Sequence, residues 1–259
     1  MANQISQRKV ERKSRLLGLL SRNGSRSIEE LAFEMGVSTS TLRRELRELI
    51  ETGVVSLHAG QVELMTASET EFPFRARLYM NQEEKQRIAM AALQLIQNGE
   101  VIFMAGGTTT LELARLLPGQ RRLTVITNAL HIADLLVDQP NINLMILGGT
   151  VRLHERTMHG LLTEAGIQQV RADKFFYGAQ AISLQHGVTH SQLQEVSTDR
   201  ALAAAATQTI VLVDHSKFGR LAPALVLPLD KVHVIVTGGE TASEYVEPLR
   251  ERGISVIPA

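Results

Sequence analysis

The chain has 259 residues, of which 44% are hydrophobic and 21% charged, and its 27 basic side chains balance 27 acidic ones. This composition is typical of a soluble protein with a packed core and excludes a chain that is disordered throughout. The sequence contains no cysteine, which excludes disulfides, thiolate metal sites and a cysteine nucleophile. Without the apolar core of a signal peptide or an apolar run of about 18 residues, we expect a cytoplasmic protein with no membrane partner.

The N-terminal segment is basic, although the whole chain carries no net charge. Between residues 8 and 22 one acidic residue, Glu11, stands against a basic set: Arg8, Lys9, Arg12, Lys13, Arg15 and Arg22. A local excess of positive charge is typical of surfaces that contact phosphates. A solvated helix face is the alternative interpretation, and a charge run taken alone favours it.

Two helices are predicted in the first part of the chain. The first covers residues 8–21 and ends at Asn23-Gly24. Its apolar face consists of Leu16, Leu17, Leu19 and Leu20. Ser27 and Glu30 have the spacing of a capping box, in which each side chain bonds the backbone of the other, and this pair predicts the start of the second helix.

A tight turn and a third helix follow. Gly36 suits the turn because glycine accepts a positive φ, and Val37 can plug the core beside it. Ser38 is expected to cap a third helix over Thr39–Thr52. We expect its apolar residues to face inward: Leu42, Leu46, Leu49 and Ile50. Residues 54–64 then predict a two-stranded wing that turns near Ala59-Gly60.

This arrangement predicts a winged helix-turn-helix that binds double-stranded operator DNA. In such modules the start of the third helix contacts base edges, and flanking basic residues hold phosphates. The predicted DNA-binding residues are Ser38, Thr39, Ser40, Thr41, Arg43, Arg44, Arg47 and, in the wing, His58. The alternative is a three-helix module for protein contacts, but the turn, the paired arginines and the wing together favour DNA.

The sequence divides into two domains. Residues 1–65 form the predicted winged helix-turn-helix, and the polar, acidic stretch that leads to Pro73 suggests a linker over residues 66–81. Residues 82–259 form the predicted effector-binding and oligomerisation domain. We expect strands at 101–104, 123–126, 143–147, 174–179, 209–213, 232–236 and 254–257. We expect helices at 82–97, 110–117, 129–137, 161–170, 196–206 and 243–252.

Alternating strands and helices, with nearly continuous apolar strands, predict an α/β fold with a mostly parallel sheet. Such sheets bind ligands at the carboxyl ends of their strands. Gly106, Gly107, Thr108, Thr109 and Thr110 follow the first strand and open a helix, so their backbone amides can hold a phosphate. A capped tight turn is the alternative. Further polar groups follow later strands at Asn128, Gly149 and Arg152.

The run Asp214-His215-Ser216-Lys217-Phe218-Gly219 also follows a strand. It concentrates an acid, an imidazole, a hydroxyl and an ammonium group, so catalysis is conceivable, although adjacent loop residues rarely all face one site. No metal site is predicted, because the histidines show no carboxylate or imidazole partner at ligand spacing. His154 and His159 are interpreted as loop residues.

The chain resembles the DeoR family of sugar-metabolism repressors over nearly its whole length. In the N-terminal module the resemblance lies in the segment from Ile28 to Gly53; in the second domain it lies in Thr127-Asn128, Leu147-Gly148-Gly149, Gly187-Val188-Thr189 and, most distinctively, the run from Asp214 to Gly219. The resemblance implies a ribose-phosphate-isomerase-like effector domain that binds a phosphorylated sugar and thereby releases the repressor from DNA. It adds Glu195, Asp214 and Lys217 to the predicted effector contacts.

Three positions depart from the family pattern. Ala59 replaces a glycine in the wing, Ala105 replaces the aspartate that usually precedes Gly-Thr-Thr, and Asp199 stands where a lysine is usual. The last two fall in the expected pocket and bear on the identity and charge of the effector.

The sequence therefore predicts a transcriptional regulator, a repressor that works as a homodimer or homotetramer without a cofactor or catalytic residues. Two heads can read two half-sites of an operator, which motivates the oligomer. The alternative function is a sugar-phosphate isomerase or a CoA-transferase-like enzyme that carries an accessory helix-turn-helix. Glu195, Asp214, His215 and Lys217 would be its acids and bases.

Overall fold

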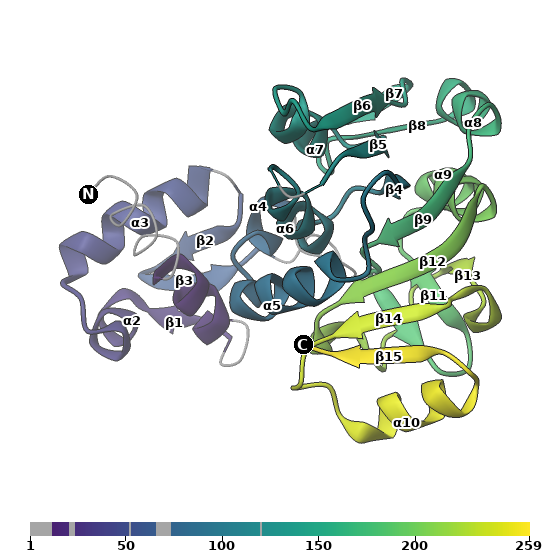
Figure 1. Ribbon diagram of the computed structural model, residues 1–259. Helices are drawn as coiled ribbons and strands as arrows, with labels where there is room; N and C mark the ends of the chain where they lie inside the picture. The colour runs from purple at the N-terminus through teal and green to yellow at the C-terminus, as the bar shows by residue number, and fades with distance from the viewer. Residues whose placement is uncertain (1–11, 21–23, 52, 66–73, 120) are drawn as a thin grey trace. The chain divides into compact units, whose positions relative to one another are not determined.

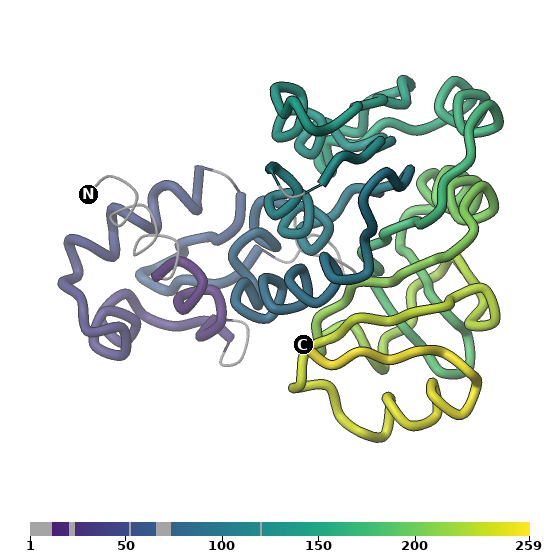
Figure 2. Tube along the Cα trace, in the orientation of Figure 1, coloured from purple at the N-terminus to yellow at the C-terminus, as the bar shows by residue number. Residues whose placement is uncertain are grey.

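The computed structural model describes residues 12–20, 24–51, 53–65, 74–119 and 121–259. The chain forms two compact units, of which the first ends at Gln82 and the second begins at Glu83 (Figures 1 and 2). Within the predicted linker, residues 66–73 lie outside the described residues, and α4 (Phe74–Arg77) follows them. Among the described residues no helix has the length and apolar character needed to cross a membrane.

The first unit has the predicted helices and wing. A helix over residues 12–20 is followed by β1 (Arg26–Ser27), α2 (Ile28–Met35), α3 (Thr39–Glu51), β2 (Val55–His58) and β3 (Gln61–Leu64). The strands form an antiparallel sheet in the order β1-β3-β2. The wing turns at Ala59 and Gly60, which have positive φ angles of 49° and 81°. The predicted ends of the first helix, residues 8–11 and 21–23, lie outside the described residues.

The predicted start and end of α2 are confirmed. The Ser27 hydroxyl accepts a bond from the Glu30 amide at 3.1 Å, and the Glu30 carboxylate accepts one from the Ser27 amide at 3.0 Å. These bonds satisfy amides that have no partner inside the helix. Gly36 ends α2 with a φ of 66°, a conformation that glycine adopts without steric cost.

The core of the first unit is apolar and continuous. It includes Leu16, Leu17, Leu20, Leu31, Leu42, Leu46, Leu49, Val54 and Val62. The prediction that Ile50 faces this core is wrong, because its side chain is 39% exposed. Ile50 lies about 100° around the helix from Leu49 and so faces solvent. A charged residue takes a place on the buried face instead, since Glu45 is only 1% exposed.

The second unit is built on a seven-stranded sheet in the order β15-β14-β12-β9-β4-β5-β6. Its strands are β4 (Val101–Met104), β5 (Leu123–Thr127), β6 (Ile142–Ile146), β9 (Ala172–Tyr177), β12 (Ala206–Val213), β14 (Val234–Thr237) and β15 (Ser255–Pro258). Every neighbouring pair in this sheet is parallel, which confirms the predicted fold class. The central strands β4 and β9 supply fully buried phenylalanines, Phe103, Phe175 and Phe176.

Among the residues that the structure describes, six α-helices accompany this sheet: α5 (Gln82–Leu93), α6 (Thr108–Leu116), α7 (Leu130–Leu136), α8 (Leu161–Gln168), α9 (Leu193–Ala204) and α10 (Ser243–Glu251). In Figure 1, α10 lies along the β15 end of the sheet, whereas α7, α8 and the hairpin of β7 (Thr150–Arg152) and β8 (Thr157–His159) lie toward the β6 end. A second, antiparallel sheet has the order β10-β11-β13. Its strands are β10 (Ala181–Ser183), β11 (Gly187–His190) and β13 (Ala224–Leu227).

Because the strands of the large sheet run parallel, the loops that follow β4, β5 and β9 emerge at one edge. These loops contain Gly106, Asn128 and Gly178. The fold thus brings polar segments that are distant in sequence to the edge where α/β sheets bind ligands.

Candidate DNA-binding face and effector site

The face of α3 opposite the core carries the predicted DNA-binding arginines. Arg43, Arg44 and Arg47 are all exposed. Arg43 lies 3.9 Å from the Glu29 carboxylate, with both side chains more than 60% exposed, so this ion pair is weak. Arg44 and Arg47 have no partner among the described residues. The three guanidinium groups are therefore available for an external anion.

The hydroxyl groups at the start of α3 bond one another. The Ser38 hydroxyl lies 2.9 Å from the hydroxyl of Ser40 and 2.9 Å from that of Thr41, and it accepts the Thr41 amide at 3.2 Å. Ser38 therefore caps the helix as predicted, while Thr39 and Ser40 remain exposed. His58, at the end of β2, is also exposed.

Three residues of the basic N-terminal run have a structural role, and one of them, Arg15, donates to the Glu34 carbonyl at 2.7 Å. Arg12 donates to Glu45 at 2.8 Å through Nε, and Lys13 donates to Glu48 at 2.8 Å, which ties the first helix to α3. Lys13 is only 6% exposed. It therefore belongs neither to a surface that contacts phosphates nor to a solvated helix face, the two interpretations of the charge run. Arg8, Lys9 and Arg22 lie outside the described residues.

In the second unit, the loop between β4 and α6 requires its two glycines. A Cβ at Gly106 would clash with the Thr157 side chain. Gly107 has a φ of 152°, and a Cβ there would lie 3.1 Å from the Thr110 hydroxyl. That hydroxyl donates to the Gly107 carbonyl at 3.0 Å. No side chain caps α6, so its first amides stay available, and these amides point outward from the positive end of a helix dipole.

The end of β5 holds Asn128 in a fixed orientation. Its side-chain amide donates to the Met158 carbonyl at 2.9 Å. Its Oδ1 atom is buried and has no hydrogen-bond partner among the described residues. An unsatisfied buried acceptor costs free energy, so this oxygen is a candidate ligand contact.

Gly149 allows the β6–β7 turn to pass closely under the start of α8. Its φ is 158°, and a Cβ there would clash with the Thr163 hydroxyl and the His159 carbonyl. Thr163 donates to the Gly148 carbonyl at 2.8 Å. The structure thus gives Gly149 a packing reason that is independent of a ligand.

An ion pair joins Arg152 of β7 to Glu195 of α9. His190 Nε2 lies 3.7 Å from the other oxygen of Glu195. This pairing corrects the expectation that the histidines have no carboxylate partner, because the chain turns from β11 into α9 between His190 and Glu195 and brings the two side chains together. Arg152 is half-buried and Glu195 is buried, so the pair is partly shielded from water.

His159 is also corrected: it is not a loop residue but lies in β8, where its side chain is buried. Its Nε2 lies 2.7 Å from the Thr157 hydroxyl. Burial, with Arg152 as the next cause, lowers the pKa of His159 to about 4. The imidazole is therefore neutral at physiological pH. Its Nδ1 atom is buried and has no partner in the described part of the chain.

The buried face of α9 contains more polar groups than the sequence predicted. Glu195, Thr198 and Asp199 are one turn apart, and all are less than 9% exposed. Burial raises the pKa of Asp199 to about 7, and the Tyr177 hydroxyl opposes this shift. Asp199 was identified from the sequence only as a departure; its burial against β9 follows from the packing.

Asp214 and His215 belong to a further cluster with Glu84 of α5. One Glu84 oxygen accepts the His215 amide at 2.7 Å, and the other lies 2.7 Å from His215 Nδ1. Burial raises the pKa of Glu84, and the bonds from His215 oppose this shift. Ligand atoms of Glu84, Asp214 and His215 lie within 4.8 Å of one another, a spacing that could hold a metal ion. The Ser216 amide donates to Asp214 at 3.1 Å.

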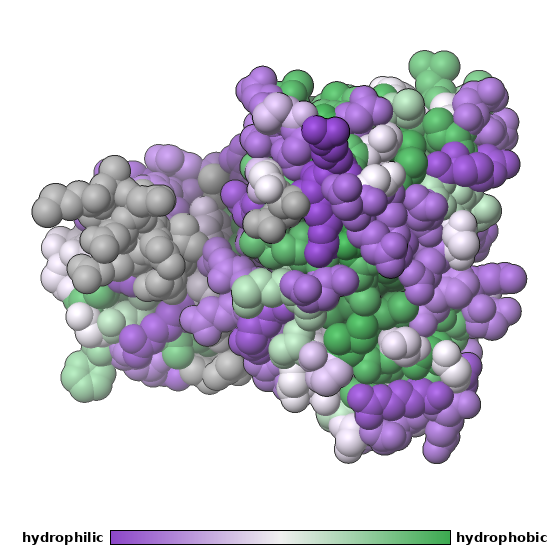
Figure 3. Space-filling model, in the orientation of Figure 1, coloured by the Kyte–Doolittle hydropathy of each residue, from purple (hydrophilic) through white to green (hydrophobic). Residues whose placement is uncertain are grey.

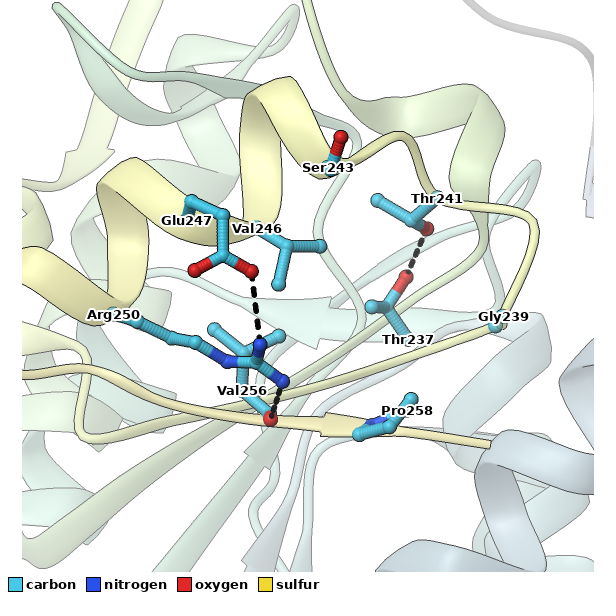
Figure 4. A pocket seen from close by; sticks show the side chains of 10 residues that line it. Thr237, Gly239, Thr241, Ser243, Val246, Glu247, Arg250, Val256 and Pro258 are labelled. Carbon is cyan, nitrogen blue, oxygen red and sulfur yellow. Dashed lines mark hydrogen bonds and ion pairs between the residues drawn. The ribbon is translucent and has the colours of Figure 1, made fainter.

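A shallow pocket lies elsewhere, beside α10 (Figure 4). Its volume is about 200 Å³, and its lining residues come from the β14–α10 segment and from β15. Arg250 crosses it and donates to Glu247 at 3.0 Å and to the Val256 carbonyl at 3.4 Å. None of the predicted effector residues lines this pocket.

The structure therefore divides the predicted effector residues into groups. In one group, Gly106 packs against Thr157 of β8, and Asn128 donates to the Met158 carbonyl of the same strand. In the other, Arg152 of β7 pairs with Glu195 of α9. The polar residues that sequence reasoning missed here are His131, Thr157, Tyr177, His190 and Thr198. Only their polarity within apolar segments could have signalled them.

Comparison with known proteins finds a match for each of the two units. Residues 12–67 match the DeoR-like helix-turn-helix domain, and residues 80–239 match the DeoR C-terminal sensor domain. The HTH-type transcriptional regulator GolR of Listeria innocua is 32% identical over 247 residues, which cover 95% of this chain and 97% of that protein. The glycerol-3-phosphate regulon repressor of Escherichia coli is 29% identical over 249 residues, which cover 96% and 98%.

Among solved structures, ribose 5-phosphate isomerase A from Methanocaldococcus jannaschii covers 53% of this chain and 55% of its own, with a TM-score of 0.41 and 19% identity. At this level of similarity the strand order, rather than the comparison, defines the fold. The matched domains and the full-length relatives define the family. The chain belongs to the DeoR family of DNA-binding transcriptional regulators.

Proposed function

We propose that the protein represses genes of carbohydrate metabolism by binding double-stranded operator DNA, and that a phosphorylated sugar releases it. The observation that carries the proposal is the combination of two features in one chain. The first is an exposed arginine face on α3, and the second is a sensor unit whose polar side chains face inward at the ligand edge of a parallel sheet. Operator binding would place the protein with chromosomal DNA, in the cytoplasm.

Arg43, Arg44 and Arg47 are the proposed phosphate and base contacts, with Thr39, Ser40, Thr41 and His58 beside them. Arginine forms bidentate bonds with guanine in the major groove and with phosphates along the backbone. Arg44 and Arg47 need not break an internal ion pair to do so. Ser38 would act mainly as the cap that fixes the start of α3.

The effector phosphate is proposed to bind at the start of α6. The amides of this helix have no side-chain cap, and glycines at 106 and 107 leave room for the approach of an anion. Thr108 and Thr109 are buried at this position and can add hydroxyl donors. Asn128, Arg152, Glu195, Asp214 and Lys217 remain proposed contacts of the effector.

We propose that this site binds its ligand without converting it. Glu195, one of the acids available for catalysis, is already paired with Arg152 and His190. Asp214 accepts bonds from the amide and hydroxyl of Ser216. A general base must instead reach the proton that it removes.

We also propose that the protein is a homodimer or homotetramer. Figure 3 shows apolar residues exposed around β7 and α8, and Leu153, Leu161 and Leu162 are each at least 75% exposed. Side chains of this size usually lie in interfaces when they gather on a surface. Light scattering at micromolar concentration tests this point, and a monomer that still binds operator would contradict it.

The effector proposal is tested by calorimetry with a panel of sugar phosphates on the wild type and on Thr108→Val. The expected result is binding by the wild type and a loss of about tenfold in the variant, if the hydroxyl contacts the phosphate. Thr207→Val, at an exposed position, is the matched control. Equal binding by all three proteins would show that the β4–α6 loop is only a turn.

Release from DNA is tested with an operator selected from genomic DNA by the wild-type protein. The bound sugar phosphate should weaken operator binding by roughly 5- to 150-fold, and DNA must weaken sugar binding by the same factor. Turnover of the sugar without any effect on DNA binding would favour the enzyme instead.

A further inference from the structure

Two acidic side chains lie one turn apart on the buried face of α9, and their surroundings differ. Glu195 has cationic neighbours in Arg152 and, when protonated, His190. Asp199 is 5% exposed, and the polar group beside it is the Tyr177 hydroxyl. Among the described residues no cation lies beside its carboxyl. Arg200, the next residue, instead donates to the carbonyls of Leu225 and Val226.

A buried carboxylate without a counter-charge is costly. Buried charges in proteins are normally paired, and a missing partner costs several kcal/mol. Burial raises the pKa of Asp199 to about 7, so the group loses its charge readily in the ligand-free protein. A cation supplied from outside would restore the ionised form and remove this cost.

Asp199 is linked to the proposed phosphate loop through β9. A Cβ added to Gly178, which follows Tyr177, would lie 3.9 Å from the Gly107 Cα atom, so the end of β9 packs against the start of α6. Tyr177, whose hydroxyl interacts with the Asp199 carboxyl, is therefore the residue that precedes this close approach. A ligand with its phosphate at this loop would reach Asp199 by extending past the end of β9.

Three further buried polar atoms, at the end of β5, on β8 and on α9, have no hydrogen-bond partner among the described residues. Helix α9 packs against β8, so these atoms belong to the same part of the unit as Asp199. Asn128 Oδ1 is an acceptor, and His159 Nδ1 is an acceptor when Nε2 donates to Thr157. The Thr198 hydroxyl is fully buried and has no partner in the described part of the chain. A ligand that presents several N–H or O–H groups would satisfy this set, whereas a purely anionic ligand would not.

The loop before α6 and the buried face of α9 both border the end of β9. The Ala105 amide donates to the Phe176 carbonyl at 3.1 Å, and Asp199 lies beside Tyr177.

We propose that the effector of this protein carries a protonated amine as well as a phosphate, as an amino-sugar phosphate does, and that Asp199 is the counter-ion of the amine. This inference rests on the proposed function, because it assigns a second chemical group to the same ligand. The phosphate is held at the start of α6, and the ammonium group is recognised at α9.

Matched ligand pairs that differ only in amine against hydroxyl test the proposal. Glucosamine 6-phosphate is compared with glucose 6-phosphate, and galactosamine 6-phosphate with galactose 6-phosphate, by calorimetry on the full-length protein at about pH 7.5. In at least one pair the wild type should bind the amine about tenfold more tightly, as expected for a charge-assisted bond in a buried site. The N-acetylated sugars, which lack the charge, should lose this advantage.

Asp199→Asn should bind both members of the pair equally, at the affinity of the hydroxyl sugar. Asp138→Asn, at an exposed position, should keep the wild-type preference. The melting temperatures of both variants show that they fold. Equal binding of each pair by the wild type, or a preference that persists in Asp199→Asn, would overturn the inference and leave the phosphate proposal standing. If no sugar phosphate and no inorganic phosphate binds, the proposed function fails, and this inference with it.

Discussion

Both units of the protein bury an acidic side chain, and they treat it differently. In the first unit Glu45 is 1% exposed, and Arg12 from the preceding helix neutralises it. In the second unit Asp199 is 5% exposed, and no cation lies beside it among the described residues. In the first unit the buried carboxylate is thus paired internally, and the arginines of α3 lie exposed on the surface. The second keeps unsatisfied polar groups inside, as expected of a site that a ligand completes.

The largest expected effect concerns the pH dependence of stability caused by Asp199. Its pKa is about 7 in the folded protein, compared with an ordinary value of 3.8. Between these values the unfolded chain releases a proton that the folded protein keeps. The contribution of protonated Asp199 to the unfolding free energy is therefore fully present below about pH 4. It is lost as the pH rises from there through 7, and the loss is on the order of 4 kcal/mol.

Urea unfolding of the wild type and of Asp199→Asn between about pH 4 and pH 8 measures this loss. The difference in unfolding free energy between the two proteins should move in favour of the variant as the pH rises. Tyr177 and the Arg152–Glu195–His190 cluster are present in both proteins, so the difference reports the change at position 199. A difference that stays constant over the range would show that Asp199 is already compensated.

The comparison is sharpened by removing the counter-ion in the first unit. Arg12→Met leaves Glu45 buried and partnerless, and we expect a loss of about 2–3 kcal/mol of unfolding free energy. The value lies at the low end for buried pairs because the Arg12 side chain is 35% exposed. Arg44→Met, on the exposed face of α3, is the matched control and should change stability by less than about 0.5 kcal/mol. Equal losses in both variants would contradict the role given to the pair.

The outward arginines should affect DNA binding without affecting folding. Arg44→Ala should weaken operator binding by roughly 1–3 kcal/mol if the side chain contacts a base in bidentate fashion. If it contacts only a phosphate, the loss should be uniform across sequences and should reduce the salt dependence of binding. Fluorescence anisotropy on the selected operator measures both, with Arg171→Ala in the second unit as control. Unchanged affinity in single alanine variants of Arg43, Arg44 and Arg47 would exclude this face.

The smallest effect is expected in the wing. Ala59 has a φ of 49°, a conformation that costs an alanine about 1 kcal/mol more than a glycine. Ala59→Gly should therefore raise the unfolding free energy by up to about 1 kcal/mol, less the added entropy of the unfolded chain. Thermal unfolding measures the change. Val62→Ala, which empties part of the core beside the wing, should act in the opposite direction.

The main helices and strands could be predicted from the sequence because each has a local cause. The capping box at Ser27 and the positive φ at Gly36 depend on neighbours within a few residues, and the apolar runs of β4 and β9 reflect burial on both sides of a sheet. The strands β7, β8, β10, β11 and β13 escaped prediction. Each has only three or four residues, and all but β13 mix polar with apolar side chains, so they lack the apolar run that marked the equally short β4.

The candidate site was readable only in part, because its chemistry lies in pairings across the sequence. The sequence by itself determined the helix-turn-helix, the parallel sheet, the glycine-threonine loop and the unusual residue at position 199. Tertiary structure alone decided that Arg152 neutralises Glu195, that Glu84 bonds His215 from 131 positions away, and that Asp199 is buried without a cation. Side-chain charge is a local property, whereas desolvation and pairing depend on which distant strands and helices the fold brings together.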